Sequence, residues 1–342
     1  MLVDSLIERL FAAEANKKIG DFLRTIRARG GLTSRQLRVT GTEEELKDAI
    51  REAIVASALS VNDLAAHVDS VEENGNQHIF IFDLTDIGVA ELTSQRARGQ
   101  KINGTTPTEN AYEAHPTDRL TWHMDRGNRL ILKQVYTASF WRKNDTESTR
   151  TEEREVMVYD RVRRRAINML VIDSSRRRAE IRISRVEGSL ESDRKAVERL
   201  GEFVSRLAPF LNLEEHLIPT PIWNAFLAIA TNREEIVMYW DRAAEARLSV
   251  TLSDRSIGRS GDVRDHPDYR LHGAKWARKE LRVSWRRGSG EDAEEIAVKL
   301  SEVKYEEVSI GKVELFKPID PDALNYVTGR IRHFTAEASN RS

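Results

Sequence analysis

The chain has 342 residues, of which 40% are hydrophobic and 32% are charged, and its formal net charge is -1. This composition indicates a folded protein long enough for two domains, and it excludes the disordered class, which has fewer apolar residues and a larger net charge. The absence of cysteine excludes disulfides, a thiolate nucleophile, iron–sulfur clusters and cysteine-based zinc sites. No uncharged apolar run approaches the ~20 residues of a membrane helix, and the start of the chain carries Asp4, Glu8 and Arg9, unlike a signal peptide. We therefore expect a cytoplasmic protein that does not bind a membrane.

The first 94 residues predict a helical module that ends in a short strand. Apolar residues recur at three- and four-residue steps over 4–29, and Gly30-Gly31 ends this predicted helix. Thr42, with Glu45 three positions later, predicts a capping box for a second helix, and Ser60 predicts the cap of a third. Asn74-Gly75 predicts a turn before a strand over 78–84. Helices followed by a strand are found in winged helices and in bundles that lean on a sheet, and we favour the bundle.

Residues 95–120 predict a loop-rich linker, because they contain glycine, asparagine, threonine and proline with almost no apolar residue. We place the domain boundary here.

Residues 121–342 predict an α+β domain with a mainly antiparallel sheet, since strands, then helices, then strands follow one another. The expected strands are 129–141, 155–163, 166–172, 179–184, 247–252, 280–285, 295–300, 303–308 and 312–316. Strands 166–172 and 179–184 are expected to form a hairpin. The expected helices are 189–211 and one that begins at Pro219 and Pro221.

Arginine is the most informative residue type, with 41 arginines and only 13 lysines. Residues 126–185 contain 16 basic and 8 acidic residues, a local excess of 8 positive charges. A guanidinium is planar and always charged, and its donors match phosphate and carboxylate oxygens.

The two-residue period of a strand separates these arginines from apolar residues. Over 155–163, the valines share one face and Met157, Tyr159, Arg161 and Arg163 share the other. The same alternation occurs over 179–184 and 280–286. We therefore expect three strands to form a sheet with one apolar face and one face that bears arginine.

This pattern predicts a nucleic-acid-binding platform in which arginines contact phosphates and Trp141, Tyr159 or Trp285 stacks on bases. The predicted phosphate contacts are Arg161, Arg163, Arg164, Arg165, Arg176, Arg177, Arg178 and Arg182. Two alternatives remain open: the arginines meet an acidic protein partner, or they form a solvated sheet face paired with Glu152, Glu153, Glu155 and Glu180.

Catalytic motifs are scarce. The chain has no Walker A, Gly-x-Gly-x-x-Gly, Gly-x-Ser-x-Gly or His-Glu-x-x-His motif. Asp268 followed by Glu302 and Lys304 loosely resembles the carboxylate and Glu-x-Lys arrangement of restriction-type nucleases, in which the acids bind Mg²⁺. This resemblance supports a nuclease as an alternative function, with Mg²⁺ as its cofactor.

We expect a non-enzymatic binding or assembly subunit without a cofactor. Its partner would be DNA or RNA, and the N-terminal helices would be free to contact another protein or a second copy of the chain.

Overall fold

The computed structural model describes residues 2–13, 16–74, 77–93, 106–107, 120–124, 129–150, 154–185, 193–245, 248–253, 262–265, 277–288, 294–315 and 319–339. None of the helices within these ranges is long and apolar enough to cross a membrane.

Four helices form an N-terminal bundle: α1 (Leu2–Ala13), α2 (Asn16–Arg29), α3 (Glu43–Val55) and α4 (Val61–Glu73). The expected single helix over 4–29 is wrong. Two helices take its place, so that Leu6 and Leu10 of α1 and Leu23 of α2 reach one shared apolar core. The predicted caps are confirmed: Thr42 and Glu45 form the capping box of α3, and the Ser60 side chain accepts a hydrogen bond from the backbone N–H of Asp63.

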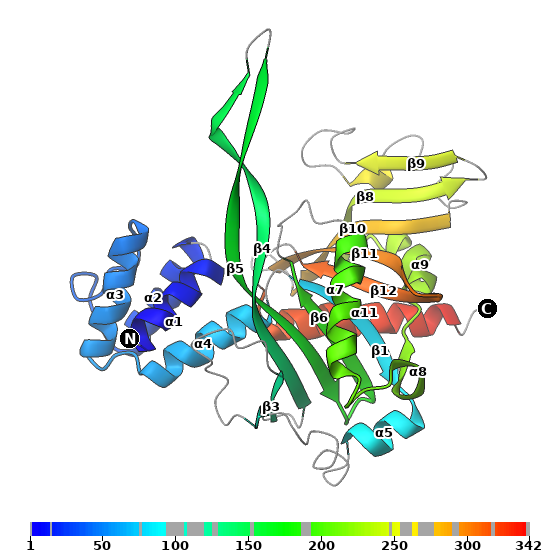
Figure 1. Cartoon of the computed structure of the whole chain (residues 1–342), viewed down its shortest axis with the longest axis horizontal. Coiled ribbons are helices and arrows are strands. Elements are labelled where there is room, and N and C mark those ends of the chain that lie inside the picture. The colour runs from blue at the N-terminus through cyan, green and yellow to red at the C-terminus, as the bar shows by residue number, and fades with distance from the viewer. Residues whose placement is uncertain are drawn as a thin grey trace.

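The rest of the chain is built on one large, mainly antiparallel sheet, which confirms the α+β class (Figure 1). Its strands lie in the order β2-β3-β4-β5-β6-β1-β12-β11-β10-β8-β9, and β7 pairs with β1. The strand bounds are β1 Gln77–Leu84, β2 Thr106–Pro107, β3 Leu120–Met124, β4 Arg129–Arg150, β5 Glu155–Asp173, β6 Arg178–Ser184, β7 Leu217–Pro219, β8 Ile236–Glu245, β9 Leu248–Ser253, β10 Ala277–Arg287, β11 Glu294–Tyr305 and β12 Val308–Leu315.

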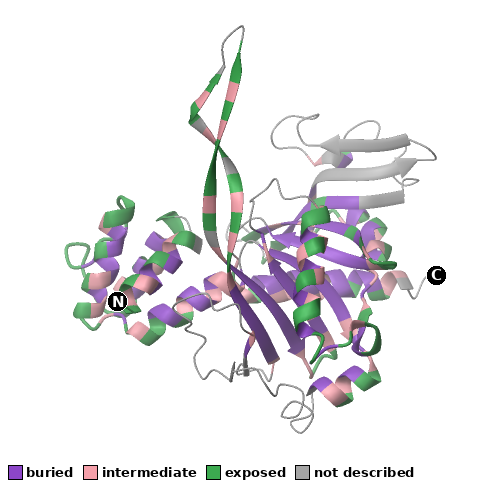
Figure 2. Cartoon of the chain, in the orientation of Figure 1, coloured by how far each residue is buried: buried purple, intermediate pink, exposed green. Residues whose placement is uncertain are grey.

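Helices cover both faces of this sheet. On one face, α5 (Asp86–Thr93), α7 (Asp193–Leu207) and α8 (Leu213–His216) pack on an apolar core that includes Phe80 and Phe82 of β1. On the other, η2 (Ile222–Ala225), α9 (Phe226–Thr231) and α11 (Pro321–Ser339) pack on a core that includes Ile79 and Ile81. A short 3-10 turn, η4, spans Val263–Asp265. Since Phe80 and Ile79 are adjacent, β1 contributes side chains to both cores, and seven of its eight residues are buried. Figure 2 shows the middle of the sheet in the colour of buried residues.

Strand β1 is the link between the helical bundle and the sheet. It lies between β6 and β12 in the middle of the sheet, and α1 and α4 pack against β5. This arrangement is a bundle that leans on a sheet, as we favoured over the winged helix. The linker expected over 95–120 lies outside the described residues except for Thr106, Pro107 and Leu120, so the domain boundary stays a prediction.

Several expected strands differ in extent from the observed ones. The strands expected over 155–163 and 166–172 are one continuous strand, β5, and those expected over 295–300 and 303–308 are combined in β11. Because β11 continues to Tyr305, the turn between β11 and β12 lies at Glu306 and Glu307. Glu306 has the positive φ of 52° that such a tight reversal requires. Strand β8 and helices α5 and α11 were not expected.

Candidate nucleic-acid interface and arginine-lined pocket

The outer halves of β4 and β5 form a two-stranded ribbon that leaves the sheet. Strand β4 pairs with β3 only up to Gln134, and β5 pairs with β6 only from Asn168 onward. Residues 135–150 and 155–167 therefore pair only with each other, with a register shift between Asn144 and Thr149. We call these residues the ribbon, and Figure 1 shows it projecting from the body of the molecule.

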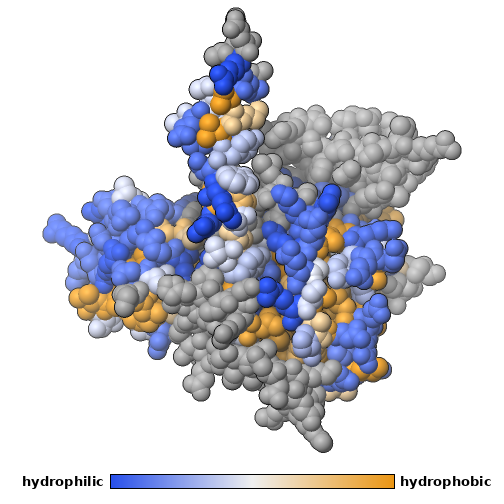
Figure 3. Space-filling model, in the orientation of Figure 1, coloured by the Kyte–Doolittle hydropathy of each residue, from blue (hydrophilic) through white to orange (hydrophobic). Residues whose placement is uncertain are grey.

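One face of the ribbon combines aromatic and cationic side chains. Because directly paired residues point to the same side, the register places Trp141 beside Arg161, Lys143 beside Tyr159 and Ser139 beside Arg163. We call the set Trp141, Lys143, Met157, Tyr159, Arg161 and Arg163 the aromatic–arginine face. By the same alternation, the exposed Glu155 lies two residues before Met157 at the outer end of this face, opposite Arg150. Figure 3 shows apolar and strongly hydrophilic residues next to one another along the ribbon.

These large apolar side chains are exposed to solvent. Trp141 is 67% exposed, and Met157 and Tyr159 are each 49% exposed. The Arg161 Nη2 donates to Ser139 Oγ over 3.3 Å. Arg163 makes no hydrogen bond or ion pair with any residue that the structure describes. The third aromatic candidate, Trp285, is fully buried under α11 and cannot stack on a base.

The predicted alternation along 155–163 agrees with burial. Val156, Val158 and Val162 are half-buried, whereas Arg161 and Arg163 are exposed. By register, Arg164 lies on the valine side, opposite Ala138, and its side chain is outside the described residues.

Two of the eight predicted arginines instead contact the C-terminal end of α4. Arg165 Nε donates to Glu72 Oε1 over 2.8 Å, and burial lowers the pKa of Arg165. Arg182 is 4% exposed; it donates from Nε and Nη2 to Glu180 and from Nη1 to the backbone carbonyl of Glu73. The bundle therefore covers the part of the arginine surface that Arg165 and Arg182 occupy.

The last three predicted arginines lie at the β5–β6 hairpin. Arg176 is exposed, and its Nε lies 3.8 Å from Asp173 Oδ2. Arg177, with a positive φ of 53°, pairs with Asp86 of α5. Arg178 makes no hydrogen bond or ion pair within the described part of the chain.

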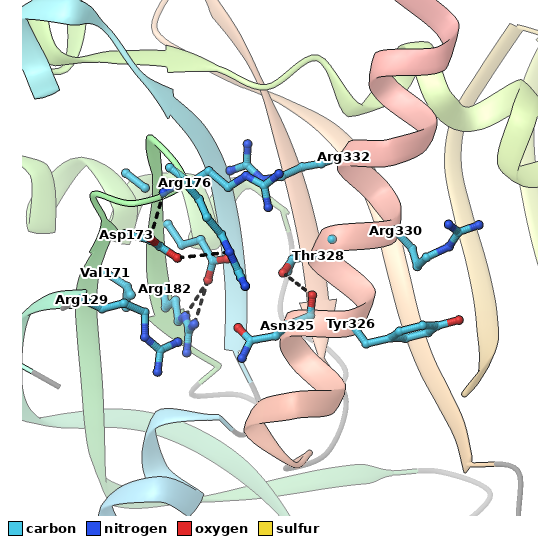
Figure 4. A pocket seen from close by; sticks show the side chains of 14 residues that line it. Arg129, Val171, Asp173, Arg176, Arg182, Asn325, Tyr326, Thr328, Arg330 and Arg332 are labelled. Atoms are coloured by element: carbon cyan, nitrogen blue, oxygen red, sulfur yellow. Dashed lines mark hydrogen bonds and ion pairs between the residues drawn. The ribbon is translucent and has the colours of Figure 1, made fainter. Parts of the chain in front are cut away.

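The hairpin and α11 enclose a pocket of about 340 Å³. Figure 4 shows Arg176 and Arg182 on the hairpin side and Asn325 and Thr328 facing them from α11, while Tyr326 and Arg330 point away. The lining includes six arginines (Arg129, Arg176, Arg178, Arg182, Arg330 and Arg332) and two carboxylates (Asp173 and Glu180).

The expectation that three strands share one arginine face is wrong. Across the sheet, Arg182, Ile79, Val313, Leu300 and Leu281 are successive register partners, and the last four lie in the core under α11. Since Leu281 points to the α11 side, Arg282 points to the α7 side, opposite Arg182. The arginines of β6 and β10 therefore lie on different faces.

The nuclease candidates are only partly within the described residues. Asp268 lies outside them. Glu302 and Lys304 are exposed on β11 and line a broad groove of about 620 Å³ beside α7, together with the carboxylates of Asp193, Glu198 and Glu306. Across the described residues, no three histidine or acidic side chains are placed to hold a metal ion.

A buried ionic cluster on the α7 side was not anticipated. Lys312 pairs with Asp193, Arg185 Nη2 lies 3.0 Å from Glu314 Oε1, and Lys299 Nζ lies 2.9 Å from Glu280 Oε1. These residues alternate with apolar ones, a pattern that is also typical of a solvated face.

The pocket residues of α11 were missed because the helix itself was missed, although Leu324, Val327 and Ile331 have helical spacing.

No protein-family model matches the sequence, and no curated protein is detectably similar to it.

Proposed function

We propose that the protein binds single-stranded nucleic acid through the aromatic–arginine face of the ribbon, as a non-enzymatic subunit in the cytoplasm. The observation that carries this proposal is a surface on which exposed Trp141 and Tyr159 lie next to Arg161, Arg163 and Lys143. Aromatic side chains stack on unpaired bases, and arginines beside them contact the backbone phosphates.

The exposure of the ribbon supports binding over a purely structural role. An isolated two-stranded ribbon is at most marginally stable in water, and large apolar side chains on it are a cost unless a partner covers them. The cationic residues favour a polyanion as that partner. Among the described residues no ion pair neutralises the two arginines, since Arg163 has no partner there and Arg161 donates to Ser139.

The first prediction concerns the two ribbon arginines. We expect R161Q/R163Q to weaken binding to labelled single-stranded DNA and RNA, because each substitution removes a cation that would neutralise a phosphate. The slope of log affinity against log salt should fall by about 0.7 for each phosphate that is no longer neutralised. The matched control is R29Q/R35Q, which removes two exposed arginines from the helical bundle. The variant W141A/Y159A should cost about tenfold or more in affinity, because stacking contributes ~1–3 kcal/mol per base.

Fluorescence anisotropy across a salt series measures both effects, with duplex DNA and RNA as further probes. Failure of the wild-type protein to bind any probe at low salt, or equal binding by R161Q/R163Q and R29Q/R35Q, would overturn the proposal. The ribbon would then be assigned to an acidic protein partner. Mg²⁺-dependent cleavage of any probe would instead favour the nuclease alternative.

A further inference from the structure

The pocket between the β5–β6 hairpin and α11 has the properties of a binding site for a small anion. Its volume of about 340 Å³ is in the range of small-molecule sites, and it is distinct from the ribbon. Its lining contains six arginines and two carboxylates, an excess of four positive charges.

Ion pairs neutralise part of this charge. Asp173 lies beside Arg176, and Glu180 holds Arg182. Outside the lining, Asp83 pairs with Arg332, and Glu235 with Arg330. Four arginines of the lining are thus paired, whereas Arg178 makes no ion pair in the described part of the chain. The pocket therefore offers the guanidinium of Arg178 to an anion.

Two polar side chains of the lining have no partner in the described part of the chain. Arg178 makes no hydrogen bond or ion pair there, and neither does the side-chain amide of Asn325. Arg178 is also close enough to Arg332 to lower the pKa of that group, in addition to the larger effect of burial. Two neighbouring guanidinium groups repel each other, and an anion placed between them relieves this repulsion.

The chemistry of the donors identifies the class of anion. Arg176 presents forked N–H donors from the hairpin side, and Asn325 presents an amide donor from α11 (Figure 4). Arg178, also in the lining, adds a second forked group of donors. A phosphomonoester carries about -1.5 to -2 charges near pH 7 and offers three strong acceptor oxygens. Its oxygens can accept hydrogen bonds from Arg178, Arg176 and Asn325 together, whereas a carboxylate has two oxygens and about half the charge.

We propose that this pocket binds a phosphomonoester, with Arg178 and Arg176 on its oxygens and Asn325 as a further donor. The phosphomonoester belongs either to a free nucleotide or sugar phosphate, or to the end of a nucleic-acid strand. The proposal does not rest on the function proposed for the ribbon, because none of the pocket residues lies on the aromatic–arginine face.

Calorimetry and anisotropy with the full chain test the proposal. The probes are inorganic phosphate, adenosine 5′-monophosphate, adenosine, and one oligonucleotide with either a 5′-phosphate or a 5′-hydroxyl. We expect the phosphorylated probes to bind more tightly than their unphosphorylated forms, and R178Q to weaken this binding about tenfold. R35Q, which removes an exposed arginine of the bundle, should bind as the wild-type protein does.

The probes separate the two sources of the phosphate. Discrimination between adenosine monophosphate and adenosine supports a free ligand, and discrimination between the two oligonucleotides alone supports a strand end. Equal binding with and without the phosphate, or R178Q binding as R35Q does, overturns the proposal. N325A provides a second variant should R178Q unfold, and R161Q/R163Q should keep the preference for phosphate even if the ribbon binds nothing.

Discussion

At the residue scale, strand alternation predicts which side chains share a face, but not how deeply each is buried. Arg161 and Arg182 both occupy the polar side of an alternating strand, and the first is exposed whereas the second is 4% exposed. The difference arises from α4, which lies over the base of β5 and β6 and places the Glu73 carbonyl against Arg182. A contact between residues more than 100 positions apart leaves no local signal in the sequence.

His78 illustrates a residue whose chemistry follows from such burial. It is fully buried on β1, and its Nδ1 lies 3.9 Å from Glu314 Oε2. Burial lowers the pKa of His78 strongly, and the nearby cations Lys312, Arg185, Arg199 and Lys299 lower it further. The folded protein therefore keeps this ring neutral.

We predict that His78 makes the protein less stable in mild acid. Below pH ~6.5 the unfolded chain protonates this ring and the native chain does not, so the free energy of unfolding should fall by up to about 1.4 kcal/mol per pH unit. Urea unfolding between pH 7.5 and 5 measures this slope, and H78N should reduce it. A ring proton resonance of His78 that titrates with a midpoint near 6.5 would contradict the prediction.

At the element scale, the sequence predicts the strands better than their ends. The run Arg163-Arg164-Arg165 suggests a break in β5, because three adjacent charges do not fit a half-buried strand. In the structure these residues lie where the strand leaves the sheet. Arg163 is exposed there, and Arg165, on the same face of the strand, meets Glu72, so this face accepts both charges. Two alternating strands can also turn their polar sides to opposite faces of the sheet, because the two-residue period does not specify the register between strands.

Because the two ribbon strands pair only with each other, we expect that the ribbon can be removed without breaking another strand pair. Replacing residues 139–163 by Asn-Gly joins Ala138 to Arg164, which are register partners, through a two-residue hairpin loop. We expect the shortened protein to fold, since the deleted residues contribute to neither main core, and to lose its affinity for single-stranded nucleic acid.

Thermal unfolding and anisotropy measure these two properties together. The R161Q/R163Q variant serves as the reference for a partial loss of binding. A shortened protein that is folded and still binds as the wild type does would show that the ribbon is not the interface.

At the scale of the whole molecule, the helical bundle is joined to the sheet by charge. The bundle has its own apolar core, separate from the two main cores of the sheet and from a smaller cluster on β4 and β5. Between them, Glu72 of α4 binds both Arg9 of α1, over 2.7 Å, and Arg165 of β5, over 2.8 Å. Lys133 of β4 adds a contact of 3.1 Å to Glu73. Such a junction depends on complete pairing, because an uncompensated buried charge is costly.

We therefore predict that E72Q destabilises the protein by ~3 kcal/mol at pH 7, since it leaves Arg9 and Arg165 buried without their shared carboxylate. Burial alone would raise the pKa of Glu72, but the hydrogen bond from Arg9 and the charge of Arg165 outweigh it and lower the pKa. The stabilisation is thus present above pH ~4.5 and is lost as the pH falls below it, through the native pKa. E198Q, which breaks the exposed pair with Arg194, should cost only about 0–1 kcal/mol. Urea unfolding at pH 7 and pH 4 compares the two variants, and equal effects would mean that the junction does not depend on this carboxylate.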